Sequence, residues 1–184
     1  ALGHGVMAVF SSTIYSGRDI QKISNFKTDA FDQKDFGCLG YMNDDKVMMF
    51  SRTFKKHTLQ SVFSEKPITE LPPVGIVYYY AGAKPDILTM MAQNHRGIVI
   101  IGSGSGNYSQ AWLNEIETLA AQGIIFVRAS RVNQGIVYES DVFDPHNVCI
   151  PSNTLSGQKA RVLLMLALSV TQNTKEIKRI FNEY

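Results

Sequence analysis

The sequence has few cysteines and no long apolar run, and these two absences exclude several classes of protein. No apolar run approaches the roughly 20 residues that a membrane-spanning helix needs. The two cysteines, Cys38 and Cys149, are far apart and form no Cys-x-x-Cys pair, so the sequence indicates neither a zinc site nor a disulfide framework. We expect both thiols to be buried and unreactive.

An excess of charge of one sign is also missing. The 18 Lys and Arg residues against 16 Asp and Glu give a formal net charge of +2. These charges are spread along the chain and form no basic stripe of the kind that nucleic-acid binding needs. The four histidines show no metal-ligand spacing. We therefore expect no nucleic-acid partner, no membrane partner and no metal.

What the sequence does contain divides into three parts. Residues 1–50 hold an apolar stretch at Gly5–Phe10, which predicts a buried strand, so that the chain is expected to begin partway through a sheet. Residues 51–72 are mixed in charge, lack periodicity and lead into the Pro72-Pro73 pair, which is typical of an interdomain linker. The part from residue 73 to 184 is regular.

Apolar strands and helices alternate in that last part. Their order predicts a parallel α/β layer. The expected strands are Val74–Ala81, Ile98–Ile101 and Ile124–Val127, and the expected helices are Pro85–Asn94, Ser109–Gln122, Gln158–Leu168 and Thr174–Phe181.

A glycine-rich loop, Gly102–Asn107, follows the second of these strands. At the carboxyl end of a parallel strand, glycines let backbone amides approach a small polar ligand. A dinucleotide site would need a third glycine where Asn107 stands and an acidic residue where Arg128 stands. A phosphate loop would end in Gly-Lys-Ser/Thr, and a nucleophile elbow would have serine in place of Gly104. The loop thus favours a small polar or zwitterionic ligand that contacts amides and the Asn107 carboxamide, and no nucleotide cofactor.

Segments along the whole chain, in order and with nearly constant spacing, carry a resemblance to a known family. They are Gly17–Lys22, Phe36–Tyr41, Lys56–Thr58, Leu71–Tyr78, Gly104–Asn107, Arg128–Val132 and Gln158–Leu168. These segments resemble the bacterial type II L-asparaginases, also called asparaginase/glutaminases.

The resemblance implies a fold class and a domain organisation. Family members are about twice as long, with a larger N-terminal α/β domain, a linker and a smaller C-terminal α/β domain. The chain would then hold the last part of the first domain (residues 1–50), the interdomain linker (51–72) and a C-terminal domain with a parallel sheet and Rossmann-like layers (73–184). The family's Gly-Gly-Thr-Ile segment, which bears the nucleophilic threonine, and its Gly-Thr-Asp-Thr segment do not occur in the sequence.

The resemblance also implies roles for three residues. Lys22 matches the catalytic lysine, which needs a pKa lowered by burial; from the residues alone it would be a surface lysine after a turn. Asn107 matches the asparagine that a neighbouring subunit contributes to hold the amino-acid end of the substrate; from the residues alone it would end a left-handed turn or cap a helix. Asp141 aligns with a glutamate that receives the α-ammonium group across the same interface, and it is one methylene shorter.

The activity implied is that of an amidohydrolase without metal or cofactor. A threonine attacks the side-chain amide of L-asparagine, ammonia leaves, and the acyl-enzyme is hydrolysed to aspartate. Without that threonine we expect no turnover by this chain alone. The alternatives are half of a split enzyme with a separate N-terminal half, or a non-catalytic remnant that folds, associates and binds amino acids; a nucleotide-binding module is third. A homo-oligomer with sites between subunits is expected, in the periplasm for a type II member and otherwise in the cytoplasm.

Overall fold

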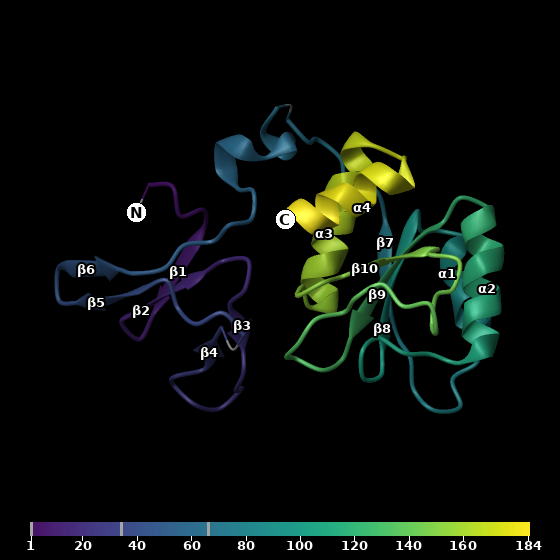
Figure 1. The fold of residues 1–184 in the computed structure, drawn as a ribbon, viewed down its shortest axis with the longest axis horizontal. Helices are drawn as coiled ribbons and strands as arrows, with labels where there is room; N and C mark the ends of the chain where they lie inside the picture. Colours follow the sequence, from purple (N-terminus) through teal and green to yellow (C-terminus); the bar gives the residue numbers. More distant parts are fainter. Residues whose placement is uncertain (1, 34, 66) are drawn as a thin grey trace. The chain divides into compact units, whose positions relative to one another are not determined.

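Two structural units, Ala1–Glu65 and Lys66–Tyr184, make up the chain. The structure is a computed structural model (Figure 1), and it describes residues 2–33, 35–65 and 67–184. None of the helices within these residues has the length and apolar character needed to cross a membrane.

The second unit is built on a parallel sheet with the strand order β10-β9-β8-β7. The strands are β7 (Val74–Tyr78), β8 (Gly97–Gly102), β9 (Ile125–Ser130) and β10 (Cys149–Pro151). Every residue of β8 is buried, as expected for a central strand that is covered on both faces. The register pairs Gly102 with Ser130, so β8 and β9 end side by side and the segments that follow them start at the same edge.

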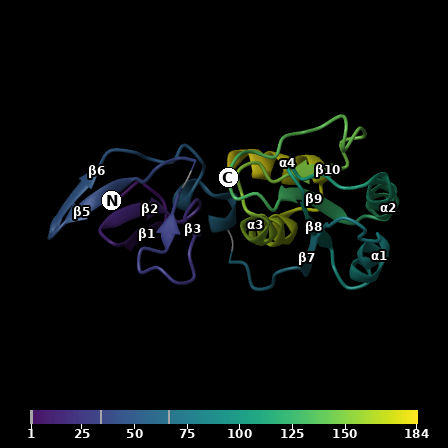
Figure 2. The ribbon, with the colours of Figure 1, turned by 90° about the horizontal axis from the view of Figure 1, so that it is seen from below.

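Helices cover both faces of this sheet. They are α1 (Asp86–Ala92), α2 (Gln110–Ala121), α3 (Gly157–Val170) and α4 (Thr174–Glu183). Figure 2 shows α1 and α2 on one face and α3 and α4 on the other. Trp112 and Ile116 of α2 belong to a buried cluster with Ile98 and Ile100 of β8 and Phe126 of β9. Apolar residues at helical spacing in α2 and in continuous runs in β8 and β9 therefore produce the core.

The parallel α/β layer expected from residue 73 onward is confirmed, and each expected helix and strand is present with slightly shifted ends. One strand, β10, was not expected. It has three residues and includes Pro151, which is too short for a periodic pattern and contains a residue that usually argues against a strand.

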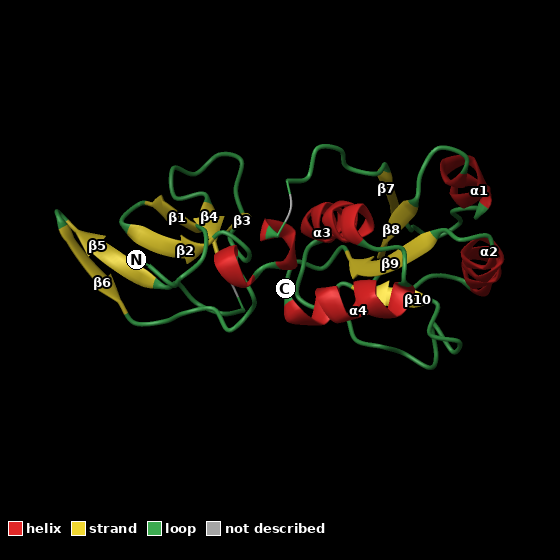
Figure 3. Cartoon of the chain, turned by 90° about the horizontal axis from the view of Figure 1, so that it is seen from above, coloured by secondary structure: helices red, strands yellow, loops and turns green. Residues whose placement is uncertain are grey.

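The first unit is antiparallel. Its four-stranded sheet has the order β1-β2-β5-β6, and β3 and β4 form a separate pair (Figure 3). The strands are β1 (Met7–Phe10), β2 (Thr13–Ser16), β3 (Gln21–Lys22), β4 (Phe31–Asp32), β5 (Gly40–Asn43) and β6 (Lys46–Met49). Two 3-10 turns, η1 (Thr58–Gln60) and η2 (Val62–Ser64), follow.

The expectation of a buried strand at Gly5–Phe10 is wrong. The strand begins at Met7, pairs with β2 at one edge of the sheet, and leaves Val9 and Phe10 exposed by 54% and 36%. An apolar run indicates burial only when another layer covers it. The expectation of a buried thiol holds for Cys149, but Cys38 in this unit is only half-buried.

Candidate functional site

The glycine-rich loop after β8 closes on itself. The Ser103 amide donates to the Asn107 carbonyl at 3.0 Å, and the amides of Gly106 and Asn107 donate to the Ser103 carbonyl at 3.0 and 2.7 Å. These three amides are used inside the loop, so the expectation that the loop offers its amides to a ligand fails for them. The loop lies at the carboxyl end of the parallel sheet, where α/β proteins bind ligands.

Two glycines let this loop fold back onto the sheet. A Cβ at Gly102 would lie 2.3 Å from the Gly106 carbonyl carbon. A Cβ at Gly106, which has φ +88°, would lie 3.0 Å from Cγ of Arg128 and 3.1 Å from the Ala129 carbonyl oxygen. Gly102 thus allows the loop to fold back on itself, and Gly106 allows it to pack against β9, so a side chain at either position would displace the loop.

The side chain of Asn107 carries the loop's unexplained polar atom. Its Oδ1 is buried and accepts no hydrogen bond from the residues that the structure describes. Its Nδ2 lies near Gly104, at 3.5 Å from where a Cβ there would be. Because a buried acceptor without a donor is costly, such an atom calls for a donor from outside these residues.

Arg128, in β9, is hydrogen-bonded to the glycine loop. Its side chain is 2% exposed. Nη1 donates to the Ser105 carbonyl at 2.8 Å and Nη2 donates to the Tyr138 carbonyl. In the sequence, Arg128 was noted as a mismatch to a dinucleotide site and as part of the segment Arg128–Val132 that carries the resemblance, without a role of its own. The signal available was a charge inside the apolar run of β9, because a buried guanidinium must find acceptors.

Asp141 lies in the long loop between β9 and β10, and it is exposed. Its neighbours are anchored on both sides. Glu139 pairs with Lys178 of α4 at 2.6 Å, and His146 pairs with Glu117 of α2 at 2.7 Å. The loop therefore presents the Asp141 carboxylate to solvent between two attachment points.

Two buried groups near the end of this loop, the Cys149 thiol and the Tyr108 hydroxyl, are not suited to nucleophilic chemistry. Burial raises the pKa of Cys149 to about 12, and the nearby Asp144 carboxylate adds to that effect. Burial also raises the pKa of Tyr108, whose hydroxyl lies 3.5 Å from the Cys149 sulfur. Both groups are therefore neutral near pH 7, and Cys149 is a structural thiol.

Lys22 belongs to the first unit. It is exposed and lies on β3, where it pairs with Phe31 of β4. The burial expected for a catalytic lysine is not found within this unit. Among the described lysines of this unit, Lys55 has a lowered pKa, through burial first and then through the charge of Arg18. No pattern in the sequence distinguished Lys55.

Groups of three or more His, Cys, Asp or Glu side chains placed to hold a metal ion do not occur among the described residues. The candidate site residues of the second unit, Asn107 and Asp141, lie on the segments that follow β8 and β9, and Arg128 of β9 is hydrogen-bonded to both segments. The chemistry of these residues is that of recognition: an amide acceptor and a carboxylate suit a ligand that carries N–H donors and positive charge.

Two family models match the chain. The model "Asparaginase, N-terminal" matches residues 1–55, and the model "Glutaminase/Asparaginase C-terminal domain" matches residues 73–181. Together they match both structural units.

Individual proteins are similar over nearly the whole chain. L-asparaginase 2 of Escherichia coli K12 is 36% identical over 182 residues, which are 98% of this chain and 52% of that protein. "Probable L-asparaginase periplasmic" of Haemophilus influenzae is 34% identical over 184 residues, 99% of this chain and 53% of that protein. The chain thus spans about half the length of these curated relatives.

A solved structure is similar as well. The crystal structure of the probable cytoplasmic L-asparaginase from Campylobacter jejuni has a TM-score of 0.89 and 35% sequence identity, and the match covers 98% of this chain and 60% of that chain.

Proposed function

Because the chain belongs to the asparaginase/glutaminase family, we propose that its 184 residues are part of an L-asparaginase, an amidohydrolase that converts L-asparagine to L-aspartate and ammonia. The observation that carries the proposal is the buried Oδ1 of Asn107, which has no donor among the described residues and lies on a loop fixed at the carboxyl end of the parallel sheet. A substrate ammonium or amide N–H supplies the donor that this oxygen needs.

The proposed roles follow the chemistry of each side chain. Asn107 accepts from the amino-acid end of the substrate, and Asp141 pairs with the α-ammonium group. Lys22 assists in removing the proton from the attacking hydroxyl. These assignments come from the family resemblance of the three positions. The exposure of Asp141 and the acceptor character of Asn107 support the two binding roles.

The reaction proposed is an acyl transfer to a threonine hydroxyl. The hydroxyl oxygen adds to the side-chain amide carbon, the C–N bond breaks as nitrogen takes a proton and leaves as ammonia, and water hydrolyses the resulting ester to aspartate. Neither Gly-Gly-Thr-Ile nor Gly-Thr-Asp-Thr occurs in the 184 residues. We therefore expect the 184-residue polypeptide alone to be inactive, and the attacking threonine to come from another segment.

The first unit presents surface for such a segment. Phe26, Phe54 and Leu59 are each more than 90% exposed. The two edge strands of its sheet, β1 and β6, each have one edge that pairs with no other described strand of the unit. Exposed apolar side chains and open edges are sites of association. A covering segment would also desolvate the neighbourhood of Lys22, which is the change that lowers a lysine pKa. We propose an N-terminal half as this partner, with homo-oligomers that form sites between subunits.

The test is a chimera in which the residues of E. coli L-asparaginase 2 that lie outside the matched 182 are joined to this chain. Ammonia release from L-asparagine is followed by a coupled glutamate dehydrogenase assay. We expect release by the chimera, none by the 184-residue chain, and a raised KM for L-asparagine in an Asn107→Ala chimera. Asn114→Ala, a change at an exposed asparagine of α2, is the matched control and should keep activity. A chimera that melts cooperatively yet releases no ammonia contradicts the proposal.

A non-catalytic amino-acid-binding protein is the second candidate, favoured by the exposure of Lys22 together with the unsatisfied Asn107 Oδ1. Calorimetry of the 184-residue chain with L-asparagine and L-aspartate separates the two. Binding by the chain together with an inactive chimera supports this candidate, and heats that match buffer dilution in both titrations remove it.

The cellular compartment is proposed to be the periplasm, in line with the type II resemblance. The H. influenzae relative is named periplasmic, and the C. jejuni protein is named cytoplasmic. Fractionation of cells that produce the native protein, with marker enzymes for each compartment, decides between them.

A further inference from the structure

We propose that Arg128 is a positioning residue that couples the loop bearing Asn107 to the loop bearing Asp141, so that the two move as one body. One guanidinium donates to the carbonyls of Ser105 in the first loop and Tyr138 in the second. The importance of this coupling for a substrate depends on the proposed function of Asn107 and Asp141. The coupling itself depends only on the contacts of Arg128.

The position of Arg128 suits it to this task. The register places it opposite Ile100 of β8 and Pro151 of β10, and its side chain is 2% exposed. Its two acceptors are backbone carbonyls, so the side chain fixes the path of each loop whatever the residue type there. A guanidinium has donors in a rigid planar fork and can hold two acceptors at once, whereas an ammonium on a flexible stem cannot reproduce that geometry.

Ser130 adds a second link at the end of the same strand. Its Oγ donates to the Gly104 carbonyl and accepts a hydrogen bond from the Val132 amide at 2.9 Å. The Arg131 amide donates to the Gly102 carbonyl at 3.1 Å. The loop after β8 and the loop after β9 are therefore tied both at their start, through Ser130, and further along, through Arg128.

Two ion pairs anchor the Asp141 loop elsewhere, and Val137 of this loop packs near Gly106 of the glycine loop. The pairs Glu139–Lys178 and His146–Glu117 attach the Asp141 loop to helices, and each has one solvent-exposed partner, so that water screens the interaction. Arg128 is the buried side chain that contacts both loops in the hydrogen bonds given above. Substituting it should release the two loops together and leave the helix attachments in place.

Hydrogen exchange of the 184-residue chain, measured by NMR, tests the coupling without any activity. The reporters are the Asn107 amide, which donates to the Ser103 carbonyl, and the Val137 amide, which donates to the Asn153 carbonyl. In Arg128→Lys and Arg128→Met we expect both amides to exchange about tenfold faster or more, while β8 amides keep their protection. The matched control is Arg131→Lys, a change at the adjacent, exposed arginine, which should leave both rates unchanged.

Several outcomes overturn the proposal. Faster exchange at one reporter alone, or at neither, shows that Arg128 does not couple the loops. If the Arg128 variants do not fold, Ser130→Ala removes one link at a half-buried site, and it must speed exchange at both reporters by a smaller factor. Unchanged rates in that variant contradict the proposal.

The kinetic test uses the active chimera. Misplaced binding loops should raise KM for L-asparagine about tenfold in Arg128→Lys and change kcat by less than about threefold. A merely structural role would lower the active fraction, and so kcat, at constant KM. Coupled exchange in the chain together with an inactive wild-type chimera would refute the proposed function and leave the coupling standing.

Discussion

Oδ2 of Asp144 accepts a hydrogen bond from the amide of Cys149 at 2.8 Å, so a buried carboxylate lies beside a buried thiol. The other oxygen, Oδ1, accepts from the Val148 amide, also at 2.8 Å. Asp144 thereby binds the end of the long loop after β9 to the start of β10 at Cys149. Burial is the main cause that raises the pKa of Cys149 to about 12, and the charge of the Asp144 carboxylate is the second cause.

The first prediction concerns the reactivity of the two thiols. Cys38 is half-buried and should react with a thiol reagent such as DTNB in the native chain at pH 8, whereas Cys149 is 3% exposed and should not. Reaction of a second thiol is expected only after denaturation. The variant Cys38→Ser is the control and should show no native reaction. Rapid labelling of Cys149 in the folded variant would contradict the structure.

The second prediction is a loss of stability in alkali. The Cys149 thiol has an ordinary pKa of 9.0 and a folded pKa of about 12, so the unfolded chain releases this proton first as the pH rises. The free energy of unfolding should therefore fall between about pH 9 and pH 12. The Cys149 thiol contributes about 1.4 kcal/mol per pH unit to this slope. The raised pKa of Tyr108 acts in the same direction.

Urea unfolding of the wild type and of Cys149→Ala at several pH values measures this effect. The substitution removes an apolar side chain and lowers stability at every pH, so the slopes and not the absolute values are compared. The alkaline slope should be shallower in Cys149→Ala. Equal slopes in the two proteins would show that the thiol titrates alike in the folded and unfolded states.

Much of the second unit's fold could be predicted from the sequence because its strands are buried on both faces. Continuous apolar runs and amphipathic helices then alternate in a way that only a parallel α/β layer explains. The first unit lacked such a signal. Its strands have two to four residues, and the apolar residues of β1 and β6 are largely exposed, so periodicity could not separate strand from loop or buried from open.

The candidate site was predictable only in part, for a physical reason. Asn107 stands at the end of a glycine-rich loop after a buried strand, which is a local pattern. The contact of Arg128 with Ser105 and Tyr138 joins segments 23 and 10 residues away, and it depends on the register of β8 against β9. No local pattern encodes that register. The Lys55 environment is likewise a product of folding in the first unit.

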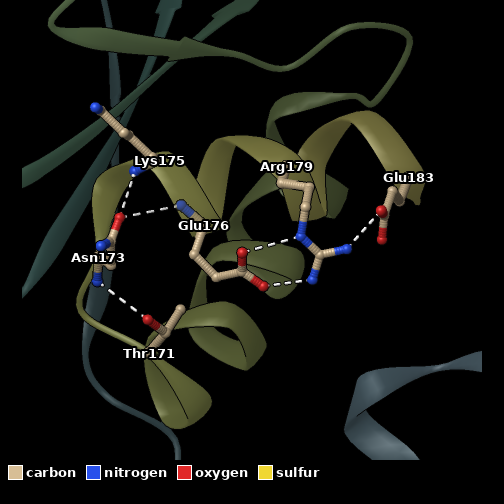
Figure 4. Close-up of polar contacts among 6 residues, drawn as sticks. All are labelled: Thr171, Asn173, Lys175, Glu176, Arg179 and Glu183. Atoms are coloured by element: carbon tan, nitrogen blue, oxygen red, sulfur yellow. Dashed lines mark hydrogen bonds and ion pairs between the residues drawn. The ribbon is translucent and has the colours of Figure 1, made fainter.

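The third prediction separates a cap from an ion-pair network at α4 (Figure 4). Oδ1 of Asn173 accepts from the amides of Lys175 and Glu176 at 2.9 and 3.2 Å, which satisfies two donors at the start of the helix. Arg179 pairs with Glu176 and Glu183 at exposed positions. Asn173→Ala should lower the free energy of unfolding by about 1 kcal/mol.

Arg179→Ala should cost less than the loss of the cap, because exposed ion pairs are screened by water and salt. Urea unfolding at low and high sodium chloride concentration distinguishes the two effects. The Asn173→Ala loss should be insensitive to salt, and the Arg179→Ala loss should shrink as salt rises. A larger, salt-independent loss for Arg179→Ala would reverse this ranking.

The fourth prediction concerns the length of the acidic side chain at position 141, where Asp141 stands. This residue is exposed, and its neighbour Glu139 is held by Lys178, so a longer side chain at position 141 can extend without displacing packed groups. In the active chimera, Asp141→Glu should lower KM for L-asparagine by about threefold, because a carboxylate carried one methylene further reaches the α-ammonium group more closely. Asp141→Asn removes the charge and should raise KM by about tenfold with kcat nearly unchanged. The control Asp45→Asn changes an exposed carboxylate in the β5–β6 hairpin and should alter neither constant. If Asp141→Asn leaves KM unchanged while Asn107→Ala raises it, the α-ammonium group is recognised elsewhere and Asp141 has no part in substrate binding.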